Sequence, residues 1–128
     1  MILDTNIIID HLRTPASRAS LLQRLSKKLP QEELALSVIS VQELYEGQST
    51  HSSQKEQALL ATITPLKILS YNFEIAEAAG IIARDLTKPI ELADAAIAAT
   101  AIVNNAQLLT LNKKDFSSIK NLILYDFN

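Results

Sequence analysis

The sequence predicts an α/β fold, in which a central, mostly parallel sheet of four to five strands has helices on both faces. Short apolar segments typical of buried strands alternate along the chain with longer segments of helical periodicity. Strands that are separated by helices pair in parallel. A chain of 128 residues is long enough to bury one core of this kind. We therefore expect residues 1–128 to form a single domain.

The first part of the chain contains two of the expected strands and two helices. Apolar residues predict strands at 1–4 and 34–38, and a helix through about Leu12 follows the first strand. Pro15 indicates the start of a second helix, because proline is favoured at the first helical position. The apolar positions of this helix recur at helical spacing: Leu21, Leu22 and Leu25.

Further helices and strands follow in alternation. Ser40 is expected to open a short helix that Gly47 closes, and another helix ends before Pro65. Asn72 is expected to cap a longer helix, and an Ala-rich helix follows at about 92–103. Three apolar segments predict the remaining strands: residues 66–69, 107–111 and 122–125.

The composition excludes several classes of function. The chain has no cysteine, which excludes disulfides, thiolate metal sites and a cysteine nucleophile. Its two glycines, Gly47 and Gly80, are too few for a Walker A or GxGxxG phosphate-binding loop. The longest nearly apolar run, 95–103, is shorter than the ~20 residues of a membrane span. Residues 1–6 lack the basic start of a signal peptide, so we expect a cytoplasmic protein.

Four scattered acidic residues are candidates for a catalytic and metal-binding site. They are Asp4, Glu43, Asp94 and Asp115. Asp4 and Asp115 follow predicted strands, and Glu43 lies in the helix after another strand, so all three belong at one edge of a parallel sheet. Asp94 lies in a helix that is apolar on every side, which is typical of a buried helix. A lone carboxylate there must be paired, bound to a cation or protonated.

Each acid also has a structural interpretation. Asp4 suits the N-cap of the helix that follows it. Ser40 and the glutamate three residues later fit a capping box, which taken alone is the favoured interpretation of that glutamate. Asp94 would interact favourably with a helix N-terminus, and Asn112 with the aspartate three residues later would cap one helical turn. The functional interpretation gains weight because the four carboxylates are expected to converge, and they repel each other unless a cation neutralises them.

The composition of this cluster indicates the metal. Oxygen ligands, without cysteine or suitably spaced histidine, favour Mg²⁺, with Mn²⁺ as a substitute, over Zn²⁺. The implied chemistry is metal-assisted hydrolysis, in which a metal-activated water attacks phosphorus in line.

The charge distribution does not decide whether the protein has a surface that binds nucleic acid. The net charge is −2, whereas proteins that bind nucleic acid over a wide surface are usually basic. Basic residues are nevertheless concentrated between residues 11 and 31, where no acidic residue occurs. They form either a solvated helix face or a local patch that steers an anionic chain to the site. These residues are Arg13, Arg18, Arg24, Lys27 and Lys28.

Four segments in this order and spacing resemble the PIN-domain nucleases, and among them the VapC-type toxins of bacterial toxin–antitoxin pairs. The segments are LDTN at 3–6, SVQELYEG at 40–47, DAAIAA at 94–99 and TLNKKDF at 110–116. The resemblance spans nearly the whole chain and implies a PIN-like three-layer sandwich. It also implies endoribonuclease activity on RNA, a homodimer and a cognate antitoxin that blocks the site. The metal-site acids that it implies are Asp4, Glu43, Asp94 and Asp115, with Asn6, Thr110 and Asn112 as polar support.

Other functions compete with this interpretation. A phosphoacceptor signalling domain has similar length and alternation, but it requires an aspartate at the end of strand three, where residues 67–71 read KILSY. A phosphatase of the two-aspartate type requires a second acid at the position of Asn6. A PIN fold kept as a non-catalytic binding or assembly module would retain all four acids without turnover.

Overall fold

A four-stranded parallel sheet forms the centre of the protein, with strand order β3-β2-β1-β4. We describe residues 1–127 of a computed structural model. The strands are β1 (Ile2–Leu3), β2 (Ala35–Ser37), β3 (Lys67–Leu69) and β4 (Leu108–Leu109). The helices are α1 (Thr5–Arg13), α2 (Leu21–Lys28), α3 (Val38–Glu46), α4 (Ser53–Ile63), α5 (Phe73–Asp85), α6 (Leu92–Val103) and α7 (Lys113–Phe116), with a 3₁₀ helix, η1 (Gln48–Thr50).

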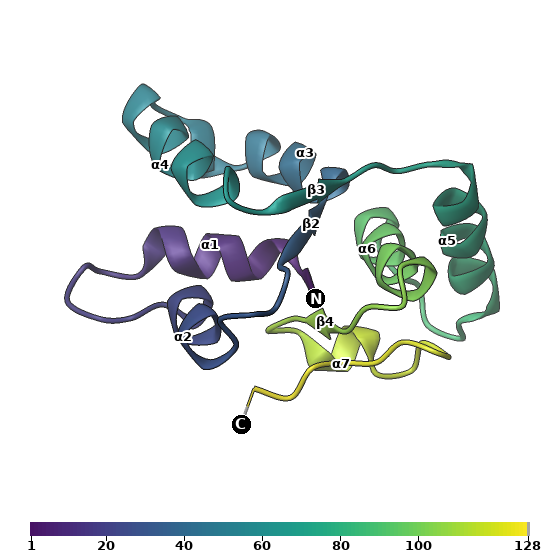
Figure 1. Cartoon of the computed structure of the whole chain (residues 1–128). Helices are drawn as coiled ribbons and strands as arrows, with labels where there is room; N and C mark the ends of the chain where they lie inside the picture. The colour runs from purple at the N-terminus through teal and green to yellow at the C-terminus, as the bar shows by residue number, and fades with distance from the viewer. Residues whose placement is uncertain (128) are drawn as a thin grey trace.

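Helices cover both faces of the sheet, as the sequence predicts. Figure 1 shows α1, α2 and α4 on one side of the strands and α5, α6 and α7 on the other. The alternation of strand and helix makes every strand run in the same direction, so all the strands end at one edge. This confirms the predicted α/β fold with its parallel sheet.

The register of the strands separates two apolar cores. Ile2 pairs with Ala35 and Leu108, and these residues belong to the core beneath α6. Each of the next residues in the three strands faces the opposite way, because side chains alternate along a strand. Leu3, Leu36 and Leu109 therefore join the core beneath α1, α2 and α4.

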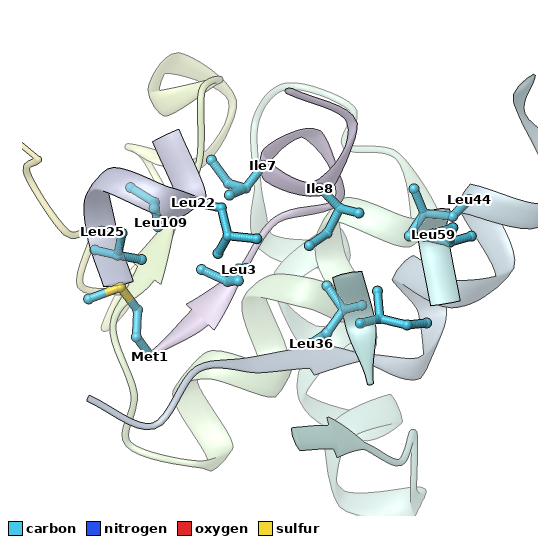
Figure 2. Close-up of a cluster of buried hydrophobic side chains, with 11 residues drawn as sticks. Met1, Leu3, Ile7, Ile8, Leu22, Leu25, Leu36, Leu44, Leu59 and Leu109 are labelled. Atoms are coloured by element: carbon cyan, nitrogen blue, oxygen red, sulfur yellow. The ribbon is translucent and has the colours of Figure 1, made fainter. Parts of the chain in front are cut away.

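Figure 2 shows this second core, where the side chains of the strands meet those of the helices. Ile7 and Ile8 of α1 are fully buried in it, as is Leu59 of α4. On the other face, residues 95–101 of α6 are all buried, and Ala95 and Ala99 contact α5. The Ala-rich sequence of α6 permits this close approach. The predicted burial of this helix is confirmed for residues 95–101 but not for its first turn, where Leu92 is exposed and Asp94 is half-buried.

Two predicted helix starts are wrong. Helix α2 begins at Leu21 rather than near Pro15, because Ser20 forms a capping box with Gln23. Helix α3 begins at Val38 rather than at Ser40, because the hydroxyl of Ser37 accepts the backbone N–H of Ile39 and caps the helix. Ser40 consequently lies inside α3.

The predicted fifth strand at 122–125 is reduced to one parallel bridge between Leu108 and Leu124. The backbone N–H of Leu108 donates to Ile123, and that of Tyr125 donates back to Leu108. Pairing stops there because β4 is short and because Tyr125 and Phe127 pack toward the core beneath α1 and α2. Among residues 1–127, no helix is long and apolar enough to cross a lipid bilayer.

Candidate active site

Asp4 lies directly after β1, and its carboxylate is hydrogen-bonded at both oxygens. Oδ1 accepts the backbone N–H of Thr5 at 2.7 Å, which makes Asp4 the N-cap of α1. Oδ2 accepts the hydroxyl of Thr110, just beyond β4, at 2.6 Å. The side chain is almost entirely buried, and burial is the main cause that raises its pKa, although the two hydrogen bonds act in the opposite direction. The capping and site interpretations of Asp4 are thus compatible.

Glu43 is half-buried in α3 and points to the start of α1. Its Oε1 accepts the hydroxyl of Thr5 at 2.6 Å, a length typical of a bond to an ionised carboxylate. The capping-box interpretation of Glu43 is wrong, because Ser37 rather than Ser40 caps α3. The carboxylate of Glu43 therefore does not cap α3. It contacts the start of α1, the helix that Asp4 caps.

Asp94 lies in the first turn of α6 and has a pKa raised to about 6. Burial is the largest cause, followed by the negative charges of the other three predicted acids and of Glu91. Those acids are, in order of effect, Asp4, Glu43 and Asp115. The contacts place these acids near one another: Thr5 hydrogen-bonds to both Asp4 and Glu43, and Asp94 and Asp115 line one hollow. The four acids, which are far apart in sequence, are thus grouped beyond the ends of the strands.

Asp115 is exposed in α7 and lies between two hollows of the surface. One hollow, of about 640 Å³, lies between α2 and the end of β4 and includes Arg24. The other, of about 530 Å³, lies beside the start of α6 and includes Asp94. Asp115 and Lys114 line both hollows, so the most exposed of the four acids stands where the two meet.

The three residues predicted as polar support lie together around Asp4. Asn6 donates from Nδ2 to the hydroxyl oxygen of Thr110 at 3.4 Å, and the backbone N–H of Asn112 donates to the same oxygen at 2.9 Å. Because that oxygen already accepts two bonds, the single hydroxyl proton of Thr110 is directed to Asp4. Asn112 also occupies the N-cap position of α7, but its side chain makes no capping hydrogen bond there.

The predicted basic residues do not all lie beside the acids. All five residues are exposed, but Arg24 is the member that lines the hollow next to Asp115. The guanidinium of Arg24 lies 4.8 Å from the ring centroid of Phe127, and Lys28 donates to the carbonyl of the same residue at 3.2 Å. Arg13 lines a separate hollow beside η1 and α4.

Three residues of the site were not predicted to belong to it. Thr5 and Ser40 hydrogen-bond with each other, and Thr5 also bonds with Glu43. Glu91 precedes α6 and adds a fifth negative charge near Asp94. Thr5 follows Asp4 directly and Ser40 lies one helical turn before Glu43, but adjacency in sequence does not reveal that the two hydroxyls meet.

Comparisons with known proteins identify the family to which this fold belongs. A family model for the PIN domain matches residues 1–122. The chain belongs to the PIN-domain family. Among curated proteins compared by sequence, none matches it.

Solved structures of similar fold extend over the whole PIN domain. One is VapBC2 from Rickettsia felis bound to a DNA fragment from its promoter. The matching chain is 30% identical, with a TM-score of 0.82, and the match covers 99% of this chain and 98% of that chain. Another is VapBC-1 from nontypeable Haemophilus influenzae, at 32% identity, a TM-score of 0.79, and 98% and 96% coverage. A third is a toxin–antitoxin complex from Klebsiella pneumoniae, at 25% identity, a TM-score of 0.74, and 98% coverage of each chain.

The donor chemistry of the site suits a hard divalent cation. The four acids offer carboxylate oxygens, and their charges raise the pKa of Asp94, a repulsion that a bound cation would relieve. Within the described part of the chain, no three carboxylate or imidazole side chains stand close enough together to hold a metal ion by themselves. Mg²⁺ typically takes one or two protein carboxylates and completes its shell with water and substrate phosphate. The residues therefore fit Mg²⁺ with few direct ligands.

The raised pKa of Asp94 predicts how the metal-free protein responds to pH. The folded protein binds this proton more tightly than the unfolded chain, whose carboxyl has the ordinary value of 3.8. The resulting stability is present below about pH 4 and is lost as the pH rises through about 6. We expect Asp94→Asn to melt at a higher temperature than the wild type at pH 7.5 in EDTA, and this difference to shrink at pH 4.5.

The matched control is Asp85→Asn. Asp85 is exposed and its pKa is lowered by the hydrogen bond from Arg84, so its substitution gives no such gain at pH 7.5. A difference between Asp94→Asn and the wild type that is the same at both pH values would contradict the assignment.

Proposed function

We propose that this PIN domain is a Mg²⁺-dependent endoribonuclease and the toxin of a toxin–antitoxin pair. The observation that carries the proposal is the grouping of four acids: Thr5 hydrogen-bonds to both Asp4 and Glu43, and Asp94 and Asp115 line one hollow. A cation bound there would supply a water activated for attack on phosphorus and stabilise the leaving oxygen.

The protein's own groups prepare the site for this chemistry. Thr5 and Thr110 fix the carboxylate of Asp4 from two sides, so its oxygens are oriented before substrate arrives. Asp94 loses its proton most readily when a cation is present, because the cation favours the ionised form. The raised pKa of Asp94 therefore couples binding of the cation to release of a proton.

The two hollows on either side of Asp115 offer a path for an RNA chain. Arg24, Lys113 and Lys114 line the first hollow, and Lys88 and Lys114 line the second. A phosphodiester at Asp115 would have neighbouring phosphates close to these cations, which would attract the chain despite the acidic net charge. In this proposal Arg24 is the RNA-contacting member of the predicted basic group, and Lys113, Lys114 and Lys88 join it.

The toxin role and its partners rest on the comparisons. The similar solved chains come from VapBC assemblies and from a complex described as toxin–antitoxin. We infer a cognate antitoxin for this chain, a homodimer and a cytoplasmic location. A small reading frame beside the gene, encoding a DNA-binding protein with a polar tail, is the expected source of the antitoxin.

Substitution of the acids tests the activity. We expect Asp4→Asn and Asp94→Asn to abolish Mg²⁺-dependent cleavage of RNA while the variants remain folded by circular dichroism, because each loses a negatively charged ligand. Glu43→Gln is also expected to lose most activity, since glutamine keeps the shape of the side chain but not its charge. Expressed without the antitoxin, the wild type should arrest growth and the variants should not.

Asp85→Asn, an exposed acid outside the cluster, serves as the control and should cleave as the wild type does. Full cleavage by both Asp4→Asn and Asp94→Asn would refute the proposed site. A wild-type chain that binds RNA but never cleaves it with Mg²⁺ would instead support a non-catalytic binding module.

The RNA path is tested by the salt dependence of binding in the Asp94→Asn background, where RNA stays intact. We expect Arg24→Gln and Lys114→Gln each to weaken binding and to reduce the slope of log K against log salt by about one. Arg18→Gln, in the exposed loop before α2, should bind as the parent does. Equal losses in all three variants would show that the charges act through the general field rather than through the hollows.

A further inference from the structure

We infer that Thr5 and Ser40 form a hydroxyl relay that positions Glu43 for the divalent cation, an assignment that rests on the proposed function. The Oγ1 of Thr5 lies 2.6 Å from Oε1 of Glu43 and 2.8 Å from Oγ of Ser40. Thr5 begins α1, whereas Ser40 and Glu43 lie one turn apart on the same side of α3. The three side chains connect two helices at the edge of the sheet where the acids gather.

The number of protons fixes the direction of this relay. A threonine hydroxyl has one proton to donate, and an ionised carboxylate can only accept. The proton of Thr5 therefore goes to Glu43, and the short distance fits a bond to a charged oxygen. Thr5 then meets Ser40 as an acceptor, so the hydroxyl of Ser40 donates to Thr5. Ser40 polarises Thr5 in the direction that strengthens its bond to Glu43.

Burial holds both hydroxyls in this arrangement. Thr5 is 6% exposed and Ser40 is fully buried, so neither hydroxyl can exchange its partner for bulk water at little cost. Ser40 is not required as a helix cap, because Ser37 has that role in α3. Two buried hydroxyls therefore stand in line behind one oxygen of Glu43: Thr5 bonds to this oxygen, and Ser40 bonds to Thr5. A purely apolar contact between α1 and α3 would not need them.

The relay also joins Glu43 to Asp4. The backbone N–H of Thr5 donates to Oδ1 of Asp4, while its hydroxyl donates to Glu43. One residue therefore sets the spacing of two of the four acids. Among the residues that the structure describes, Oε2 of Glu43 has no hydrogen-bond partner in the protein, so the relay leaves this oxygen open to a cation. Fixing the other oxygen reduces the side-chain freedom that Glu43 loses on binding.

Direct metal binding tests the relay without any assay of cleavage. The dissociation constant for Mn²⁺ is measured on the full chain by electron paramagnetic resonance of the free ion. We expect Thr5→Val to raise it by about 10-fold or more, the usual effect of removing a group that orients a metal ligand. Thr5→Ser keeps the hydroxyl and should restore binding to near the wild-type value. Ser40→Ala should have a smaller effect, of about threefold, because the bond from Thr5 to Glu43 remains.

A double-mutant cycle separates positioning from loss of packing. If Thr5 acts through Glu43, then Thr5→Val should cause no further loss of Mn²⁺ affinity in the Glu43→Gln background; independent, additive losses would overturn the relay. Thr62→Val, which removes a hydroxyl bonded to the backbone of α4, is the matched control and should bind as the wild type does. If Thr5→Val does not fold, Ser40→Ala decides, and unchanged Mn²⁺ binding in it would overturn the relay.

The outcomes distinguish the relay from the function on which it rests. A wild type that binds Mn²⁺ and cleaves RNA, beside a folded Thr5→Val variant with equal Mn²⁺ affinity, would overturn the relay alone. A wild type that neither binds Mn²⁺ nor cleaves RNA would overturn the proposed function and the relay together.

Discussion

The register between β1 and β4 places the side chains on which the site depends. Leu3 pairs with Leu109, so the residues that follow them, Asp4 and Thr110, meet at the edge of the sheet and share a hydrogen bond of 2.6 Å. A shift by one residue would exchange the two faces of the strand and turn Leu3 away from its core, toward the core beneath α6. The apolar cores on the two faces prevent such a shift, and they thereby fix the carboxylate of Asp4.

Charge crowding at this edge is the cost of the arrangement. Burial and the neighbouring negative charges both disfavour the ionised form of Asp94, and Glu91 adds to the effect. The first turn of α6 compensates in part, because a helix N-terminus favours negative charge. What remains of the repulsion makes the metal-free site less stable than a site with a bound cation, and this difference is the physical basis of the proposed affinity for Mg²⁺.

Periodicity was sufficient to predict the α/β class and most elements, because strands and helices bury different patterns of side chains. It predicted α6 at its observed bounds and Asn72 as the cap of α5. It failed at two helix starts, because each has more than one residue suited to the position. Helix α2 begins after Ser20 rather than near Pro15, and α3 begins after Ser37 rather than at Ser40. The four acids could be proposed from their places after strands, together with the resemblance to PIN-domain nucleases. The hydrogen bond between Thr5 and Glu43 could not be predicted, because it depends on how α1 and α3 pack against each other.

Anomalous X-ray scattering from crystals grown with Mn²⁺ tests the central claim most directly, because it locates the ion without reference to activity. We expect a strong anomalous peak between β1 and the start of α6, within bonding distance of carboxylate oxygens of Asp4 or Asp94. A Mn²⁺-saturated crystal with no peak among the four acids, or with a peak only at unrelated surface carboxylates, would contradict it.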